Sequence, residues 1–356
     1  MALTDIAWEA FYELDPVAKS RHLNQDDGRP FHTLMTQQFD RAALDTLGEL
    51  ATRVRFLAKT KEGMAFLSDL LPHRRAMLYF TQPSTRTFLS FCSACEILGM
   101  RIGTVRNTAT SSELKGETKD DSVRTFSSYF DCVIMRTQVG GLAERMAWVL
   151  SNSERPVPII NAGSGKDQHP TQALLDVYTL QRSFEARGGI DGKTVVFVGD
   201  LLRGRTVRSL SALLTNYEGV RQVFIAPPQL QVADDVLAIL DAHSVDYRLG
   251  DTLESVVPEA DAIYMTRVQD EWDAEAGESA KIDIERFWFR EAYLSQLKSD
   301  AVIMHPLPRR HEIPAAIDND PRAMYWRQMR NGMWIRAALI ATIFGCDGEI
   351  NAFDEA

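Results

Sequence analysis

Short apolar runs and amphipathic helical patterns alternate along most of this chain. The apolar runs predict strands at residues 76–80, 132–136, 157–161, 194–199, 222–226, 262–266 and 301–305. Helical spacing of apolar positions predicts helices at residues 40–61, 171–183, 206–215, 233–243 and 334–344. Alternation of this kind is typical of mostly parallel sheets that carry helices on both faces, so we expect an α/β fold.

Length and composition indicate a globular protein of two domains. The chain has 356 residues, too many for one ordinary core, and its 45% hydrophobic and 25% charged residues match a folded globular protein. No apolar run approaches the ~20 residues that cross a bilayer. The acidic first residues lack the basic start and apolar centre of a secretory signal. We therefore expect no membrane contact and a cytoplasmic location.

The net charge and the cysteine spacing limit the classes of function that this chain could have. A net charge of -10 argues against a nucleic-acid partner, although a local arginine cluster can still hold small anions. Cys92 and Cys95 have the C-x-x-C spacing of zinc and redox sites. They lie in an apolar helical run without a second ligand pair, whereas a zinc site needs four ligands. We interpret them as buried structural thiols.

The stretch LYFTQPSTRTFLSF, residues 78–91, suggests an anion site. An apolar strand ends there, and Ser84, Thr85, Arg86 and Thr87 begin a helix. Free N–H groups and the positive dipole at a helix start bind phosphate, and an arginine fork can hold two of its oxygens. A plain helix cap by Ser84 or Thr85 is the alternative.

A second motif, NAGSGKDQHPTQALLD at residues 161–176, also places polar groups at a helix start. His169 and Gln172 are three residues apart, so both can face one cleft. A histidine can donate to a carbonyl oxygen, and a glutamine amide can accept from an NH2 group. A satisfied histidine at a helix start is the alternative. The glycines do not form a nucleotide loop, because Lys166 is followed by Asp167, and no G-x-G-x-x-G follows a strand in the second half.

Three further segments carry polar candidates. Arg205 and Arg267 each follow a predicted strand; two converging arginines would hold a dicarboxylate, whereas surface ion pairs are their commoner role. In MHPLPRRHEI the prolines around Leu307 force an irregular backbone whose carbonyls can accept from a ligand NH2, with a plain rigid loop as the alternative. The polar stretch SSELKGETKDD, residues 111–121, predicts a surface loop, in which Lys115 matters only if the loop reaches a site.

Together, and in this order, these motifs resemble the aspartate/ornithine carbamoyltransferase family from about residue 30 to residue 345. The resemblance rests on STRT at 84–87, HPTQ at 169–172 and HPLP at 305–308. The chain is most similar to the aspartate branch, because HPLP stands where the ornithine branch usually has a cysteine and MTRVQ at 265–269 matches the aspartate-binding segment. No ornithine-type S-M-G segment is seen, and the arginine of MTRVQ has the wrong charge for a cationic ornithine.

The resemblance implies two sets of substrate-binding residues. Carbamoyl phosphate would be bound by Ser84, Thr85, Arg86, Thr87, Arg136, His169, Gln172, Pro306 and Leu307. Aspartate would be bound by Lys115, Arg205, Arg267 and Gln269. In this scheme Arg205 takes the α-carboxylate, whereas Arg267 and Gln269 take the β-carboxylate.

The same resemblance implies which groups act on the carbamoyl unit. The catalytic residues would be Arg86, Thr87, Arg136 and His169. The last three would contact the carbonyl oxygen and stabilise the negative charge that grows there. The carbamoyl NH2 would be held by Gln172 and by the backbone carbonyls at 306 and 307.

The implied reaction needs neither a metal nor an organic cofactor. The deprotonated α-amine of L-aspartate attacks the carbamoyl carbon, an oxyanion forms and phosphate leaves, giving N-carbamoyl-L-aspartate for pyrimidine biosynthesis. The acceptor of the amine proton stays open, with the departing phosphate as the group proposed for the family. In the family, the residues that match Ser111 and Lys115 enter a neighbouring subunit's site, which implies a homotrimer with shared active sites.

The expected architecture follows the family. A carbamoyl-phosphate domain would span 30–166 and be completed by 328–356, so that the last helix returns to it. An aspartate domain would span 167–327, with the substrates in the cleft between the domains. Residues 1–29 are an extension of uncertain structure, and the acidic tail is interpreted as a solvated end.

Some positions depart from the family pattern. Gln82 stands where many aspartate-branch members have an acid, Trp272 and Phe88 where arginine is common, and Leu114 where lysine is frequent. These positions concern domain closure and allosteric control rather than the reaction. Two alternatives stay open: carbamoyl transfer to another amine, such as an ornithine derivative, and a catalytically idle scaffold. The sequence does not decide whether a separate regulatory chain binds.

Overall fold

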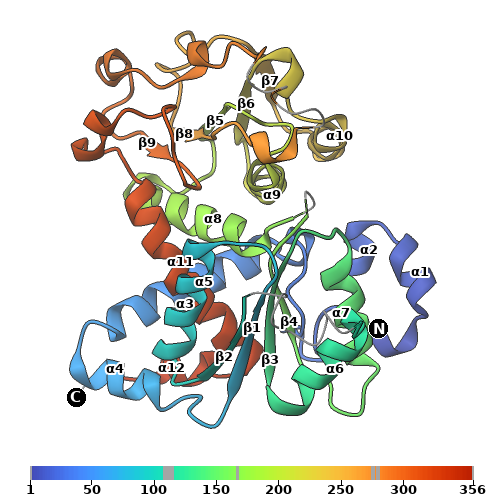
Figure 1. The fold of residues 1–356 in the computed structure, drawn as a ribbon. Coiled ribbons are helices and arrows are strands. Elements are labelled where there is room, and N and C mark those ends of the chain that lie inside the picture. Colours follow the sequence, from blue (N-terminus) through green and yellow to red (C-terminus); the bar gives the residue numbers. More distant parts are fainter. Residues whose placement is uncertain (1, 107–115, 166–167, 274–276, 278–280, 355–356) are drawn as a thin grey trace. The chain divides into compact units, whose positions relative to one another are not determined.

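The computed structural model describes residues 2–106, 116–165, 168–273, 277 and 281–354. The chain forms two compact units, of which unit 1 comprises Met1–Leu174 with Gly332–Ala356 and unit 2 comprises Leu175–Asn331 (Figure 1). Helices α8 (Pro170–Phe184) and α11 (Tyr325–Ile343) therefore each contribute residues to both units. The sequence-based boundaries, 166/167 and 327/328, lie eight and four residues before the observed ones.

Unit 1 is built on a parallel sheet with the strand order β2-β1-β3-β4. The strands are β1 (Arg75–Phe80), β2 (Arg101–Val105), β3 (Cys132–Thr137) and β4 (Ile159–Ser164). All residues of β3 and β4 are buried, as parallel strands with helices on both faces require. Thr33 extends the sheet beyond β4: it forms a parallel bridge with Ile160 and accepts a hydrogen bond from the Asn161 amide at 2.8 Å.

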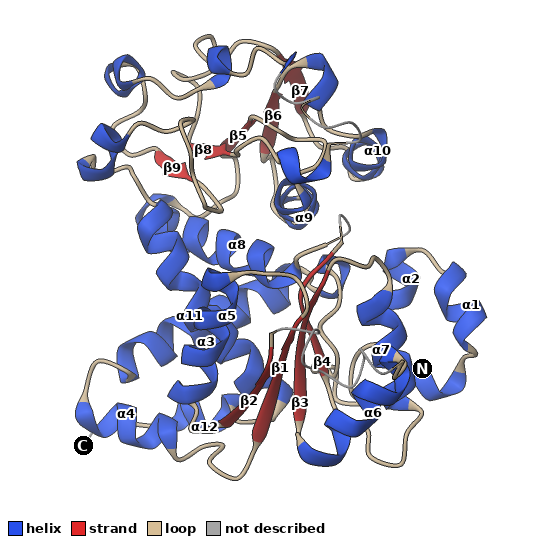
Figure 2. Cartoon of the chain, viewed as in Figure 1, coloured by secondary structure: helices blue, strands red, loops and turns tan. Residues whose placement is uncertain are grey.

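Helices cover both faces of this sheet (Figure 2). The helices that lie wholly in unit 1 are α1 (Trp8–Glu13), α2 (Pro16–Ser20), α3 (Arg41–Leu57), α4 (Lys61–Ser68), α5 (Thr85–Ile97), α6 (Lys119–Tyr129), α7 (Leu142–Ser151) and α12 (Asp347–Ala352). Helix α5 packs on β1 and β2, whereas α6 and α7 pack on the other half of the sheet. The predicted helix at 40–61 is α3 followed by the start of α4.

The N-terminal extension is an ordered part of unit 1. Phe11 is fully buried in the same apolar cluster as Met146 of α7. The Trp148 indole N–H donates to the carbonyl of Ile6 at 2.9 Å, and the Lys19 ammonium pairs with Glu144 at 2.8 Å. Because each of these contacts has one partner on α7, the extension packs against this helix.

The acidic tail also folds back, so its interpretation as a solvated end was wrong. It forms α12, in which Ile350 is fully buried. The carbonyls of Ile350 and Phe353 accept hydrogen bonds from the Arg53 guanidinium, and the Phe353 ring stacks on Phe66 at 4.0 Å between centroids. In α12 Glu349 is exposed and Asp347 is half-buried, so a short acidic helix can still bury its apolar residue.

Unit 2 is built on a second parallel sheet, with the order β7-β6-β5-β8-β9. The strands are β5 (Thr194–Val198), β6 (Arg221–Ile225), β7 (Tyr247–Gly250), β8 (Ala262–Met265) and β9 (Val302–Met304). The helices wholly within unit 2 are α9 (Arg205–Leu214) and α10 (Asp234–Ala242). Short 3-10 helices also occur in the two units, at Leu3–Asp5, Thr36–Gln38, Glu185–Arg187, Pro228–Leu230, Asp270–Trp272, Glu285–Phe287, Glu291–Ser295 and Ala315–Asn319.

The prediction of an α/β fold with two parallel, helix-covered sheets is confirmed. All seven predicted strands occur, within a few residues of their expected ends. Strands β2 and β7 were missed, because each is a sheet edge whose residues are largely half-buried or exposed and so lack an apolar run. Among the described residues, no helix combines the length and apolar character that a bilayer span requires.

The prediction that Cys92 and Cys95 are buried structural thiols holds fully for Cys95 and in part for Cys92, which is only half-buried. Cys95 is fully buried on α5, and burial raises the pKa of its thiol well above the ordinary value. Cys92 is half-buried, and burial, followed by the nearby Glu96 carboxylate, raises its pKa as well. Both thiols are therefore held in the neutral form, which is neither the nucleophilic nor the metal-binding form.

Candidate active site

Three segments of unit 1 meet at one edge of its sheet. Strands β1, β3 and β4 are parallel neighbours, so their carboxyl ends lie side by side. Helix α5 with Arg86 begins shortly after β1, Arg136 is the fifth residue of β3, and His169 follows β4 at the start of α8. In an open parallel sheet this edge is where ligands bind.

The start of α5 is open rather than capped by a side chain. Ser84 is the N-cap residue, with extended backbone at φ -163° and ψ 108°, and its side chain makes no capping hydrogen bond. The capping alternative is therefore wrong for Ser84. The first N–H groups of α5 have no partner within the helix, which leaves them available to an anion. Arg86 is exposed beside them and Thr87 is buried.

Arg136 is held at the end of β3 by its neighbours on both sides. Its side chain is buried and donates to the carbonyl of Ala162 on β4 at 3.0 Å. Its own carbonyl accepts from the amide of Thr81, just after β1, at 2.9 Å. These bonds hold a guanidinium where β1, β3 and β4 end, and they tie it to the segment that leads from β1 towards α5.

His169 and Gln172 are both buried at the start of α8. The segment before them is fixed by Gln168, whose side-chain oxygen accepts from the amide and the hydroxyl of Thr36 at 2.8 and 3.0 Å. Asn161 also donates to the carbonyl of Leu34 at 2.9 Å. Sequence reasoning missed the supporting roles of Gln168 and Thr36, because no local pattern links residues so far apart in the chain.

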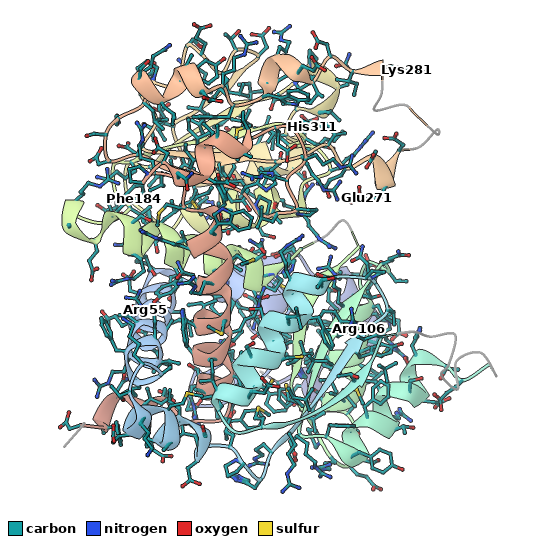
Figure 3. The ribbon with its side chains drawn as sticks, turned by 60° about the vertical axis from the view of Figure 1, so that its left-hand side comes forward. Arg55, Arg106, Phe184, Glu271, Lys281 and His311 are labelled. Atoms are coloured by element: carbon teal, nitrogen blue, oxygen red, sulfur yellow. The ribbon has the colours of Figure 1, made fainter. Side chains whose placement is uncertain are left out.

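Phe88 shows how one departure from the family pattern is accommodated. Its ring packs edge-on against Phe80, and the Arg106 guanidinium lies 4.3 Å from the centre of the Phe88 ring. Arg106, labelled in Figure 3, comes directly after β2. A cation therefore stacks on the first turns of α5 although position 88 has none.

Unit 2 brings its own candidates to one edge in the same way. Strands β5, β8 and β9 are parallel neighbours, and each is followed by a candidate segment. Arg205 is the first residue of α9 after β5, Arg267 and Gln269 follow β8, and the loop with Leu307 follows β9. The two arginines and the HPLP carbonyls thus belong to adjacent strand ends of one sheet.

Asp200, which sequence reasoning missed, ties two of these segments together. Its side chain is buried directly after β5 and accepts from the amide of Arg203 at 3.1 Å and the amide of Gln269 at 3.0 Å. Burial raises the pKa of this carboxyl, although the two amides and the Arg203 charge oppose the shift. The available signal was an acid directly after an apolar strand, in VVFVGD.

Gly199 permits the close packing of the β5 and β8 ends. It has a φ of +115°, and a Cβ built there would lie 2.2 Å from the carbonyl oxygen of Thr266. The Thr266 hydroxyl donates to the carbonyl of Val198 at 2.9 Å. Only glycine fits at this point, because any side chain would push the Arg267 segment away from the Arg205 segment.

Arg267 is held by a carboxylate of its own segment. Its guanidinium forms a two-pronged ion pair with Glu271, with one N–O distance of 2.8 Å, and donates to the carbonyl of Val268 at 2.8 Å. Glu271 is exposed at the surface of unit 2 (Figure 3). An incoming carboxylate at Arg267 would compete with Glu271 or join it.

Some residues singled out in the sequence lie outside the part of the chain that the structure describes. Ser111, Lys115 and Leu114 lie outside the described residues, and the side chain of Trp272 does too. Among the described residues, no group of three or more His, Cys, Asp or Glu side chains is arranged to hold a metal ion. The candidates that are placed are hydrogen-bond donors, acceptors and guanidinium groups, which suit anions and amides.

Comparisons with known proteins bear on this arrangement. The family model "Aspartate/ornithine carbamoyltransferase, carbamoyl-P binding domain" matches residues 32–182, and the "Asp/Orn binding domain" model of the same family matches residues 191–343. The chain belongs to the aspartate/ornithine carbamoyltransferase family. The first match covers the strand ends of unit 1 that carry the STRT and HPTQ motifs, and the second covers those of unit 2.

Individual relatives belong to the aspartate branch of this family. The chain is 40% identical over 311 residues to aspartate carbamoyltransferase 1, chloroplastic, of Pisum sativum, covering 86% of this chain and 77% of that protein. It is 43% identical over 276 residues to the aspartate carbamoyltransferase catalytic subunit of Vibrio cholerae, covering 77% and 86%. The Trypanosoma cruzi aspartate transcarbamoylase, solved with N-(phosphonacetyl)-L-aspartic acid, matches with a TM-score of 0.80 at 34% identity, covering 89% of this chain and 97% of that one.

Proposed function

We propose that this chain transfers the carbamoyl group of carbamoyl phosphate to the α-amino group of L-aspartate, giving N-carbamoyl-L-aspartate and phosphate in pyrimidine biosynthesis. The observation that carries the proposal is that the uncapped start of α5, which follows β1, and the buried Arg136, at the end of β3, lie at the carboxyl ends of paired strands of one sheet. Relatives of the aspartate branch, including one solved with carbamoyl aspartate and phosphate, support this choice of substrates.

We assign the phosphate to the α5 start with Arg86 and Arg136, of which Arg136 would also reach the carbonyl oxygen. The helix N–H groups and Arg86 would hold phosphate oxygens, as a dipole end and a guanidinium fork do. Thr87, Arg136 and His169 would donate to the carbonyl oxygen, each well-placed donor contributing on the order of 3 kcal/mol when charge develops there. Gln172 would hold the carbamoyl NH2.

We assign aspartate to the strand ends of unit 2. Arg205 would bind the α-carboxylate, and Arg267 with Gln269 the β-carboxylate. The amine then attacks the carbamoyl carbon and phosphate leaves. Holding both reactants in place converts a bimolecular step into a nearly unimolecular one, which can lower the barrier by roughly 7–11 kcal/mol. Residues of this chain supply every contact in this scheme, so we propose no metal or cofactor.

The direct test is the choice of amine. The purified chain should form carbamoyl aspartate from carbamoyl phosphate and aspartate, with much lower turnover of ornithine or its acylated derivatives. A preference for an ornithine compound would overturn the assignment to aspartate. A folded chain with no activity on any of these amines would favour a catalytically idle scaffold.

The role of Arg86 can be tested separately. Arg86→Ala should lower kcat by orders of magnitude while leaving the fold unchanged, because it removes a phosphate contact from an exposed position. Arg124→Ala is the matched control, since Arg124 is an exposed arginine on α6 of the same unit. Near-normal turnover in Arg86→Ala would contradict the phosphate role.

We further propose a homotrimer with shared sites, to which a neighbouring subunit contributes Ser111 and Lys115. Mixing inactive Lys115→Ala chains with inactive Arg86→Ala chains should then restore part of the activity, because some sites would receive both intact residues. Mixtures that stay inactive, or a monomeric mass by light scattering, would count against shared sites. A cytoplasmic location stays a prediction from the sequence, and the pea relative is named chloroplastic.

A further inference from the structure

The HPLP loop of unit 2 holds a backbone conformation that needs support. Leu307 has a φ of +57°, in the left-handed region. For a residue with a Cβ this conformation is disfavoured, and a leucine persists there only where its surroundings fix it. The carbonyl directions at positions 306 and 307 depend on this φ, so whatever fixes Leu307 also aims the loop's acceptors.

The His305 side chain fixes Leu307 directly. The Leu307 amide donates to Nδ1 of His305 at 2.7 Å, so Nδ1 must carry a lone pair. The proton of the neutral ring is therefore on Nε2, which donates to Oε1 of Glu312 at 2.7 Å. The same oxygen accepts from the amide of Arg310 at 3.0 Å. Glu312 thus selects the tautomer that lets His305 accept from Leu307.

The His305 and Glu312 side chains are buried, and further hydrogen bonds hold the backbone of His305 in place. The His305 side chain is fully buried and that of Glu312 nearly so. Burial alone would raise the pKa of Glu312, but the His305 hydrogen bond and the amides hold it below the ordinary value, so the acceptor stays ionised. The His305 amide donates to the Gln328 side chain at 2.9 Å, and Gln328 donates to Asp176 at 2.7 Å. The ring therefore has little freedom to turn.

We propose that His305 and Glu312 are positioning residues, which hold Leu307 so that the loop carbonyls accept from the carbamoyl NH2. This inference rests on the proposed carbamoyl transfer. Neither side chain touches substrate in this scheme. Their effect on the reaction passes through one hydrogen bond, from the Leu307 amide to Nδ1.

Two substitutions of His305 separate this bond from the rest of the ring's contacts. In His305→Asn the side-chain oxygen lies near the position of Nδ1 and can still accept from Leu307. In His305→Gln the side chain reaches Glu312 instead, and the acceptor for Leu307 is lost. The two variants remove similar amounts of buried ring, but His305→Asn keeps only the bond from Leu307 and His305→Gln keeps only the bond to Glu312, so their comparison shows which of the two bonds the reaction needs.

The readout compares carbamoyl phosphate with inorganic phosphate, which lacks the NH2 group. His305→Gln should raise KM for carbamoyl phosphate about tenfold, the equivalent of one hydrogen bond of about 1.4 kcal/mol, while Ki for inorganic phosphate changes little. His305→Asn should raise that KM by less than about threefold. Glu312→Ala should resemble His305→Gln, and Glu312→Gln should restore most of the affinity, because its amide oxygen can still accept from Nε2.

The control variant removes a different buried hydrogen bond of the same unit. Ser211→Ala removes another buried hydrogen bond of unit 2, from the Ser211 hydroxyl to Gln222, and should leave the ratio of the two constants unchanged. Equal changes in both constants in His305→Gln, or equal defects in the Asn and Gln variants, would overturn the positioning role. A wild-type chain that makes no carbamoyl aspartate would instead refute the proposed function.

Discussion

Acid should destabilise unit 1 through one of its buried histidines, His32. This side chain is buried, and the next residue, Thr33, forms a parallel bridge with Ile160 of β4. Its Nδ1 accepts from the amide of Ile159 at 3.0 Å, so its proton is on Nε2, which bonds to the Ser151 hydroxyl at 2.8 Å. A second proton could enter only at Nδ1, where it would break the bond to β4. Burial accordingly lowers the pKa of His32 from 6.5 to about 3.

The sign and size of the effect follow from this shift. Because the pKa is lower in the folded chain than in the unfolded one, the unfolded chain binds the proton more tightly below pH 6.5. The stability associated with neutral His32 is thus fully present above pH 6.5 and is lost as the pH falls towards about 3. The free energy of unfolding should fall by about 1.4 kcal/mol per pH unit in this window, and by about 2 kcal/mol at pH 5.

The matched variant is His32→Asn, whose side-chain oxygen can still accept from Ile159 but does not titrate. Urea unfolding at pH 7 and pH 5, followed by pulse hydrogen exchange in peptides that cover β4, reports on unit 1 alone. The wild type should lose about 2 kcal/mol more than His32→Asn between the two pH values, whatever the variant costs at pH 7. Equal losses in both proteins would refute the assignment of a neutral, buried His32.

Three further changes probe the sheet edges and the tail. Gly199→Ala should lower the melting temperature of unit 2 and the activity together, because its Cβ would lie 2.2 Å from the Thr266 carbonyl oxygen; an unchanged melting curve would contradict this close approach. Asp200→Asn should raise KM for aspartate about tenfold, because the backbone amide of Arg203 or of Gln269 would then face the NH2 group of the new side chain. Steady-state kinetics in which only the KM for carbamoyl phosphate rises would contradict this role of Asp200. Ile350→Ala should lower the free energy of unfolding, measured in urea, by about 2–4 kcal/mol, because Ile350 is buried. A loss near zero would mean that the tail is solvated after all.

If aspartate binds at Arg267 as proposed, its β-carboxylate meets a competitor within the same segment. Glu271 already occupies the guanidinium that the β-carboxylate would use. The nearby Asp270 pairs with Arg310 of the HPLP loop at 2.8 Å, and that contact, together with the Arg267 charge, lowers the pKa of Asp270 to about 2. The segment after β8 is therefore preorganised by exposed ion pairs, each of which is individually weak in water and can exchange for a substrate carboxylate at little cost.

The sequence alone determined the parts of this protein that local patterns encode. Buried parallel strands are continuous apolar runs, so β1, β5 and β8 could be located without the structure. Because parallel strands end at a common edge, the places of STRT, Arg136 and the HPLP loop at or just after the ends of strands indicate that each candidate gathers at the carboxyl edge of its sheet. The roles proposed for these residues rest on the resemblance to the aspartate/ornithine carbamoyltransferase family, to which the chain belongs.

Tertiary structure alone decided the features that depend on residues far apart in the chain. Asp200 looks like any acid after a strand until the fold brings the Gln269 amide to it. His32 becomes a buried, neutral base only because its segment, residues 32–33, pairs with β4, and the tail folds only where Arg53 and Phe66 contact it. A hydrogen bond or an apolar contact across a hundred residues leaves no periodic trace in the sequence, since each partner is ordinary in its own segment.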